Sequence, residues 1–391
     1  MNRNLWLLAL CQGLFLTNNV AFIAINGLVG LSLAPFAWMA TLPVMGYVVG
    51  GALSTPLVAR TQSRFGRRTS FQIGLAVAFA SACTAAWAVA DKNFWLLVAA
   101  TVVAGYYSAN GQLYRFAAAE LVPAPQRERA VSMVLAGGLL GAVVGPNLAA
   151  RSRTLLDVPF AGAYVVLAGV ALLAMLVMAF VRFPPHVSAP AGAGGGRPLS
   201  DIMRQPVFLV ACISAALGYG VMNLLMAATP LAMQQCGLSF DDAALVLEWH
   251  VIGMFAPGFF TGGWIKHFGT LPVMGVGVAL NLACIAIALS GVELHQFGIA
   301  LFLLGVGWNL LFTGSTTLAM GAYRPEEKDR AQAAINFCVF GVMAFTSFAS
   351  GALVSTQGWA VLNWGSVLPV GLTALALGWL AVRSRAAGKH G

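Results

Sequence analysis

The sequence predicts an all-α membrane protein whose twelve transmembrane helices form two six-helix pseudo-repeats. Three observations lead to this prediction: the scarcity of charged residues, the length of the apolar runs, and short motifs that recur half a chain apart. Of the 391 residues, 59% are hydrophobic and 8% are charged, whereas soluble domains carry about 25% charged residues. Lipid is therefore the expected solvent for most of the surface.

The apolar runs are each about 20 residues long, which is the length that an α-helix needs to cross a bilayer. Inside lipid every backbone polar group must be paired within the protein, so runs of this length form helices. The expected spans are 5–27, 36–58, 69–90, 94–117, 130–150, 159–181, 207–229, 243–265, 272–291, 296–319, 331–355 and 362–382.

The basic residues predict the orientation. With the N-terminus in the cytoplasm, all of the 21 Lys and Arg residues except Lys92, Arg151 and Arg153 fall on the cytoplasmic side. This asymmetry is typical of the positive-inside rule and places both termini in the cytoplasm. The net charge of +9 is then a topology signal, and no nucleic-acid partner is expected. We expect a multi-pass protein of the bacterial inner (plasma) membrane, in contact with the lipid bilayer.

The chain divides near its middle. Residues 183–204 include a stretch rich in Pro, Ala and Gly, which predicts a cytoplasmic linker. Residues 1–182 and 205–391 are then the N-terminal and C-terminal six-helix halves. The halves echo one another, because Arg64-Phe65-Gly66 after span 2 matches His267-Phe268-Gly269 after span 8. Parallel six-span repeats are typical of transporters that alternate access by moving one half against the other.

The segment from Arg64 to Arg68 resembles the end of the signature loop of the major facilitator superfamily, between spans 2 and 3. The resemblance implies the twelve-helix major facilitator fold and makes Arg64, Gly66, Arg67 and Arg68 candidates for a gating loop. Two positions depart from the family pattern: Ser63 replaces an Asp and Ala59 replaces a Gly. The charged latch formed by the family's Asp is therefore not expected here.

Four residues on spans 7 and 8 have side chains suited to a soft metal ion. Met222 and Met226 are spaced i, i+4, and so are His250 and Met254, so each pair projects from one face of its helix. Both pairs are expected at similar depth. Thioethers and imidazole suit Cu(I) and disfavour Mg²⁺, Ca²⁺ and Mn²⁺. The alternative is ordinary packing, because Met commonly fills gaps in apolar cores.

The C-terminal half resembles the CcoA-like group of bacterial copper importers, which carries MxxxM in span 7 and HxxxM in span 8. The resemblance implies copper binding by Met222, Met226, His250 and Met254, with copper as cargo and no cofactor. It also implies a downstream copper chaperone or a role in cytochrome oxidase assembly. Close relatives of this group are assigned to riboflavin uptake. The sequence therefore predicts a copper importer, with an importer of riboflavin or another small organic molecule as the alternative.

The organic-cargo alternative rests on aromatic and polar residues of span 4, namely Tyr106, Tyr107, Asn110 and Gln112. A multidrug exporter is a further alternative, because Gly141 to Pro146 in span 5 resembles part of a drug/proton antiporter motif; close helix packing explains these small residues better. A membrane sensor or assembly factor that transports nothing is a fourth. An enzyme is not expected, because no nucleophile–base pair, nucleotide loop or carboxylate dyad is visible.

A few other residues are candidates for function. Glu248 lies within span 8 and is a candidate for proton coupling, because carboxylates inside spans are costly. Trp308 and Asn309 on span 10, with Asn18 and Asn19 on span 1, line the cargo path or form hydrogen bonds between helices. The thiol of Cys236, in the loop after span 7, is a copper relay or is inert. The remaining five cysteines lie in spans, and no disulfide framework is expected.

Overall fold

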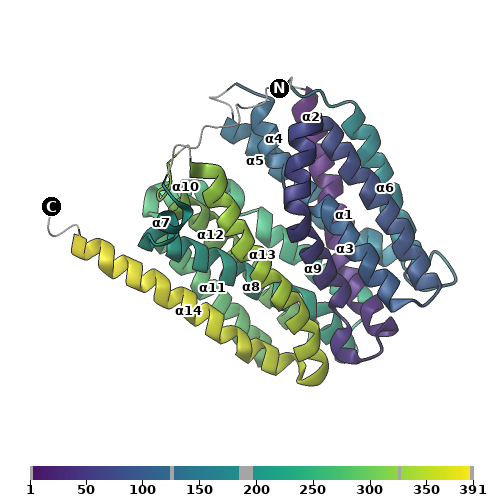
Figure 1. Cartoon of the computed structure of the whole chain (residues 1–391). Coiled ribbons are helices and arrows are strands. Elements are labelled where there is room, and N and C mark those ends of the chain that lie inside the picture. The colour runs from purple at the N-terminus through teal and green to yellow at the C-terminus, as the bar shows by residue number, and fades with distance from the viewer. Residues whose placement is uncertain (1–2, 124–126, 185–196, 325–326, 388–391) are drawn as a thin grey trace.

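The computed structural model describes residues 3–123, 127–184, 197–324 and 327–387. Two bundles of helices stand side by side, with the first half of the chain in one and the second half in the other (Figure 1). The expected all-helical fold is confirmed: long apolar helices form the bundles in the described part of the chain.

Six spans make up the first bundle. They are α1 (Arg3–Leu33), two spans within α2 (Leu42–Ala90), α3 (Phe94–Gly111) continued by α4 (Tyr114–Glu120), α5 (Arg127–Ser152) and α6 (Ala161–Ala179). The two spans of α2 cover Ala37–Gln62, which includes the short helix η1 (Ala37–Met39), and Arg64–Ala90. Gly66, with φ of 76°, breaks α2 between them.

Six further spans make up the second bundle. They are α8 (Pro206–Gln235), α9 (Phe240–Phe255) continued by α10 (Gly258–Phe268), α11 (Thr270–Ser290), α12 (Leu294–Met320), α13 (Lys328–Thr356) and α14 (Gly358–Ala387). Span 8 is therefore broken into α9 and α10, which meet at a bend of 40°. Pro257 lies at this break, where its missing N–H and its ring weaken the helix.

Nine of the described helical segments are long and apolar enough to cross a membrane, and the bent pair α9–α10 makes ten. The α3–α4 pair and α5 lie at the remaining two predicted spans. An even number of spans returns the chain to the face on which it began, so both termini belong to one face. We call it the N-terminal face and the other the far face.

The two halves repeat in backbone conformation as well as in sequence. Gly66 has φ 76° and ψ 172°, and Gly269 has φ 88° and ψ 159°. This region of backbone space is essentially restricted to glycine. Both glycines follow a Phe and precede the helix of the next span. The motif that recurs in the sequence therefore has the same structural role in the two halves, where it turns the chain between consecutive spans.

The linker predicted at 183–204 differs from expectation at its C-terminal end, while residues 185–196 lie outside the described part of the chain. A short helix, α7 (Leu199–Met203), packs the fully buried Ile202 against Phe208 and Ala322 of the second half. Arg197 binds both carboxylate oxygens of Glu327, at 2.9 and 2.7 Å. Residues 197–204 are therefore fastened to the second half. The predicted division of the chain into halves remains a prediction.

Polar contacts join the two halves across α5 and α9. The amide of Asn147 donates to a Glu248 carboxylate oxygen at 2.7 Å. Beyond it, Arg153 lies 3.6 Å from Asp241. A third contact links α2 to α13, where the hydroxyl of Thr41 accepts a hydrogen bond from a backbone N–H of α13 at 3.1 Å. These contacts lie toward the far face, where α5 ends and where α2 and α9 begin.

Candidate functional site

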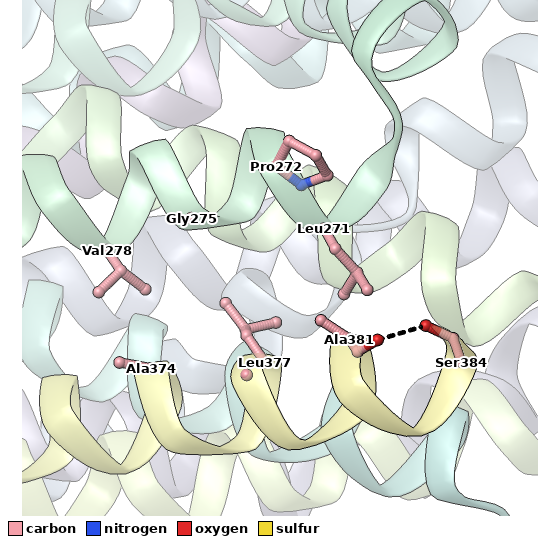
Figure 2. A pocket seen from close by; sticks show the side chains of 9 residues that line it. Leu271, Pro272, Gly275, Val278, Ala374, Leu377, Ala381 and Ser384 are labelled. Atoms are coloured by element: carbon pink, nitrogen blue, oxygen red, sulfur yellow. Dashed lines mark hydrogen bonds between the residues drawn. The ribbon is translucent and has the colours of Figure 1, made fainter. Parts of the chain in front are cut away.

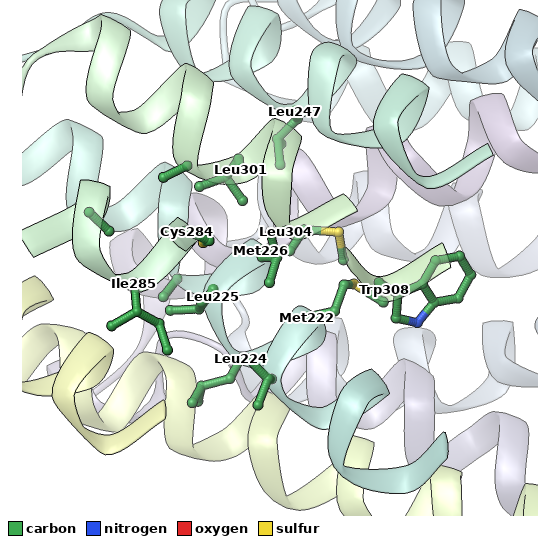
Figure 3. Close-up of a cluster of buried hydrophobic side chains, with 14 of the residues drawn as sticks. Met222, Leu224, Leu225, Met226, Leu247, Cys284, Ile285, Leu301, Leu304 and Trp308 are labelled. Atoms are coloured by element: carbon green, nitrogen blue, oxygen red, sulfur yellow. The ribbon is translucent and has the colours of Figure 1, made fainter. Parts of the chain in front are cut away.

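The two methionines of span 7 lie in the apolar core of the second half. Met222 is 1% exposed and Met226 is 7% exposed. Both belong to a cluster with Leu304 and Trp308 of α12, and Figure 3 shows Met222 beside Trp308. The two residues are four positions apart on α8, so both side chains project from the same side of this helix. Their role as metal ligands remains a prediction.

His250 and Met254 lie on α9 against α12. His250 is fully buried, and its Nδ1 lies 2.6 Å from the Leu301 carbonyl oxygen. A carbonyl can only accept, so Nδ1 carries the proton and donates. In the neutral ring Nε2 then keeps a bare lone pair, and no hydrogen-bond partner faces it. Met254 is 6% exposed and shares the buried cluster of Met222 and Met226.

The break in span 8 is held by a hydrogen-bonded clasp from α12. The side-chain N–H of Asn309 donates to the carbonyl of Met254, in the last turn of α9, at 2.7 Å. The side-chain oxygen of Asn309 accepts from the hydroxyl of Thr261, in the first turn of α10, also at 2.7 Å. Asn309 therefore bonds both pieces of the broken span and fixes where α9 ends. Asn309 was expected either to line the cargo path or to form hydrogen bonds between helices, and the structure shows hydrogen bonds between helices.

Four aromatic side chains gather where α8, α9 and α12 meet; we call them the aromatic group. Trp308 stacks on Phe312, with ring centroids 5.1 Å apart and planes 10° apart. Tyr219 packs edge-on to both rings, at 5.2 and 5.4 Å, and Phe255 lies 6.2 Å from Trp308. Sequence reasoning singled out Trp308 and missed the other three. The i, i+4 spacing of Trp308 and Phe312 was the available signal.

The span 4 residues proposed for an organic cargo do not form one surface. Tyr106 bonds Thr61 through its hydroxyl at 2.9 Å. Asn110 is fully buried and accepts from Ser70 at 3.1 Å. Gln112 is exposed. Tyr106 and Asn110 therefore fasten α3 to α2, and only Tyr107, buried with an unpartnered hydroxyl, keeps a free polar group.

The candidate gating loop is fastened to the N-terminal half. Arg67 binds Glu120 at the end of α4 with two hydrogen bonds, at 3.1 and 2.6 Å, and also bonds Gln62. Arg68 bonds the backbone carbonyl of Ala179 in α6. Arg64 lies over the ring of Phe65, 5.3 Å from its centroid. The gating role of these residues remains a prediction, but their contacts tie spans 2, 4 and 6 together.

The remaining candidates have simpler placements. Asn18 donates to a backbone carbonyl of α6 at 3.2 Å, and Asn19 donates to Tyr47 at 3.0 Å, so both make interhelical hydrogen bonds. Cys236 is exposed at the end of α8. In the described residues, no three or more His, Cys, Asp or Glu side chains gather as metal ligands would.

A second candidate site is a hollow between α11 and α14. Of its nine lining residues only Ser384 has a polar side chain, and its hydroxyl already donates to the carbonyl of Ala381 at 3.0 Å (Figure 2). Leu271, Val278 and Leu377 supply apolar surface. The hollow suits a hydrocarbon chain and offers no donor or acceptor that would select a polar cargo.

Comparison with known proteins adds a family. The model described as Major Facilitator Superfamily matches residues 5–249 and 210–390. A protein of Brucella anthropi, "Riboflavin transporter RfnT", is 37% identical over 388 residues, covering 99% of this chain and 97% of the relative. "Uncharacterized MFS-type transporter YddS" of Bacillus subtilis is 26% identical over 332 residues, covering 81% of this chain and 75% of the relative.

Solved structures agree on the fold. The D-xylose-proton symporter superimposes with a TM-score of 0.75 at 16% identity, covering 95% of this chain and 96% of the symporter. The human organic anion transporter MFSD10 gives a TM-score of 0.68 at 14% identity, covering 96% and 100%. Identities this low carry the fold and nothing about the cargo.

Proposed function

This chain belongs to the major facilitator superfamily, and from that premise we propose that it is a secondary transporter that imports riboflavin across the bacterial inner membrane. The observation that carries the proposal is the 37% identity to a riboflavin transporter over 99% of this chain. The relation covers both halves, so it includes every span that faces the cargo path. The alternative reading of the sequence is therefore better supported than the copper importer we first expected.

The chemistry of the aromatic group agrees with such a cargo. Riboflavin carries a flat three-ring heterocycle and a polar ribityl chain. Aromatic side chains bind such rings by offset stacking and edge contacts. Tyr219, Phe255 and Phe312 are each half-buried, so part of each ring remains accessible beside the buried Trp308.

The direction of transport follows from the orientation that the basic residues predict. With the termini in the cytoplasm, the far face is the outer face. The contacts Asn147–Glu248 and Arg153–Asp241 then close the outer side. Cargo held between the halves in this state would leave toward the cytoplasm, and breaking these contacts would admit cargo from outside.

Uptake in cells and in vesicles tests the proposal. A bacterial strain that neither makes nor imports riboflavin would be complemented with this chain or with empty vector, and radiolabelled riboflavin uptake measured. Purified protein in proteoliposomes would repeat the assay without other transporters. We expect uptake above the vector control that excess unlabelled riboflavin abolishes. Equal uptake in vesicles with and without the protein would refute the proposal.

Copper remains a second candidate because one observation favours it. The bare Nε2 of buried His250, with Nδ1 donating to a carbonyl, is the arrangement usual for histidines that bind a metal. Met222, Met226 and Met254 supply thioethers in the same cluster. A copper chaperone or cytochrome oxidase assembly as the downstream user belongs to this candidate alone.

A pair of matched substitutions separates the two cargoes. Met222→Leu removes a thioether and keeps the apolar bulk, while Met274→Leu makes the same change at a fully buried position outside the predicted set. If copper is the cargo, radioactive copper uptake falls with the first variant and not with the second. If riboflavin alone is carried, proteoliposomes with either variant take up no copper above background. His250→Ala then leaves riboflavin uptake intact.

A further inference from the structure

The indole N–H of Trp308 is an unexplained group in the second half. Trp308 is 6% exposed, and its Nε1 is buried without a hydrogen-bond partner. Indole nitrogen is a donor only, so this site lacks an acceptor. Leaving a buried donor unpaired lowers stability. In Figure 3 the indole lies at the edge of the drawn cluster.

The surroundings of Trp308 place it beside the other half of the molecule. Phe255, which contacts Trp308, packs against the apolar core of the second half and also against the core of the first half, which contains Leu8 and Phe71. Phe255 therefore lies where the apolar cores of the two halves meet, and Trp308 packs beside it. In the proposed function, cargo that moves between the halves would pass this boundary.

The backbone near Trp308 is fixed by neighbouring contacts. Asn309 bonds Met254 and Thr261 at the break in span 8, next to Phe255. One turn earlier on α12, Gly305 lies so close to α9 that a Cβ there would come within 2.4 Å of the His250 carbonyl oxygen. The indole and the ring of Phe255 are thus held on two helices in direct contact, which is the preorganisation that a binding site needs.

The chemistry of this place is specific. Four aromatic rings offer stacking faces and edges, one buried N–H offers a single hydrogen bond, and the group itself contains no charged side chain. Such a set suits an uncharged, flat heterocycle that presents a carbonyl oxygen at its edge. An aliphatic cargo would not use the rings, and only a cargo with an acceptor atom can pair the buried N–H of Trp308.

We infer that Trp308 is the residue that recognises the flavin ring, donating its Nε1–H to a ring carbonyl while Tyr219, Phe255 and Phe312 pack against the ring. This inference rests on the proposed riboflavin function and names the part of the cargo that the second half binds. It predicts that lumiflavin, which has the ring without the ribityl chain, competes with riboflavin.

Trp308→Phe tests the hydrogen bond, because it removes the donor and keeps an aromatic ring. Riboflavin binding to purified protein would be measured by quenching of flavin fluorescence, and thermal stability would be measured in parallel. We expect the Kd for riboflavin to rise roughly 5- to 100-fold, because the ring carbonyl is left unpaired. Thermal stability of the cargo-free protein should not fall, since the lost N–H has no partner there.

Two further variants complete the test. Trp364→Phe makes the same change at a side chain that is 66% exposed on α14, and it should leave the Kd unchanged. Phe312→Leu removes an aromatic stacking face with little change in side-chain volume. It should weaken the binding of riboflavin and of lumiflavin to a similar extent. If wild-type protein binds no riboflavin, the proposed function fails and the inference fails with it. If wild-type protein binds and Trp308→Phe binds equally well, the inference alone is wrong.

Discussion

The two halves are fastened at the N-terminal face in different ways, although they repeat the same fold. In the first half, Arg67 of the loop after span 2 binds Glu120 at the end of α4; the two side chains are 25% and 43% exposed. In the second half, Glu327, before α13, binds Arg197 from the linker; the carboxylate is fully buried and the Arg197 side chain is 34% exposed. The two halves thus share the turn glycines Gly66 and Gly269, but in the second half one member of the ion pair, Arg197, comes from the linker outside the bundle.

The difference matters because burial changes what an ion pair contributes. Exposed pairs gain little, since water and salt screen the attraction. A buried carboxylate depends on its partners, and Glu327 accepts from the Arg197 side chain and from the backbone N–H groups of Arg197 and Arg324. Replacing Arg197 would leave the buried Glu327 carboxylate without its charged partner. We therefore expect the second half to be the more sensitive to loss of its pair.

The largest effect is expected from Glu327→Ala. Two backbone N–H groups lose their acceptor, and the Arg197 guanidinium loses the carboxylate but keeps its hydrogen bond to the Ala322 carbonyl, so the attachment of α7 to the second half should weaken. We expect Glu327→Ala to have a lower melting temperature than Gly66→Ala, Gly269→Ala or Arg67→Ala. We also expect increased proteolysis between residues 182 and 206. Limited proteolysis and thermal melts in detergent would measure both. A melting temperature equal to that of Arg67→Ala would show that the two fastenings do not differ.

The same carboxylate predicts a pH dependence. Hydrogen bonds from Arg197 hold the pKa of Glu327 well below its ordinary value of 4.5. Its contribution to stability is therefore complete above about pH 4.5 and is lost as the pH falls below that value, because the unfolded chain then binds the proton first. The difference in melting temperature between wild type and Glu327→Gln should be constant from pH 8 to 5 and should shrink at lower pH.

A matched pair of glycine substitutions examines what the halves share. Gly66→Ala and Gly269→Ala each force a side chain into a positive-φ conformation, which costs about 1–3 kcal/mol. Because φ and ψ are nearly equal at the two sites, we expect similar losses of stability in thermal melts. Gly275→Ala, with an ordinary φ and no atom within 4 Å of the added carbon, serves as the control. A loss confined to one half would mean that the turns are not equivalent.

The smallest effect on stability is expected from Arg67→Ala. The pair with Glu120 is partly exposed, so its loss should cost under about 1 kcal/mol. Raising the salt concentration should narrow the difference from wild type further. Transport is a separate readout: if this loop has the predicted gating role, the rate of riboflavin uptake changes while the melting temperature hardly moves. An unchanged rate would leave Arg67 with a purely structural role.

Sequence reasoning predicted the fold well because lipid imposes simple rules. Span 7 was expected at 207–229 and lies within α8 (Pro206–Gln235). Span 8 was expected as one helix at 243–265 and is broken at Pro257. The Pro257-Gly258 pair was the available signal, although proline also occurs in continuous membrane helices, as Pro230 does in α8.

The candidate site could be predicted only in part. Met222 and Met226 were expected in one helical span and both lie in α8, because helix formation is a local property that the sequence predicts. Contacts between helices depend on rotation and tilt, which periodicity does not give. The hydroxyl of Tyr106 therefore turned out to be bonded to Thr61 of α2. Tyr219 and Trp308, 89 positions apart in the sequence, lie edge to face. The proposed riboflavin cargo rests on the similarity to a relative, because the residue types alone suited copper as well.

The polar contacts that close the far face also bear on the energy of switching. The ion pair between Arg153 and Asp241 spans 3.6 Å and is 30% and 68% exposed, so opening it costs under about 1 kcal/mol. Cargo shifts a two-state equilibrium only through its different affinity for the two states. A cargo that binds one state tenfold more tightly than the other supplies about 1.4 kcal/mol, which is more than the cost of opening the Arg153–Asp241 pair. A weakly held cargo can thus bias the population of states, which allows binding loose enough for release.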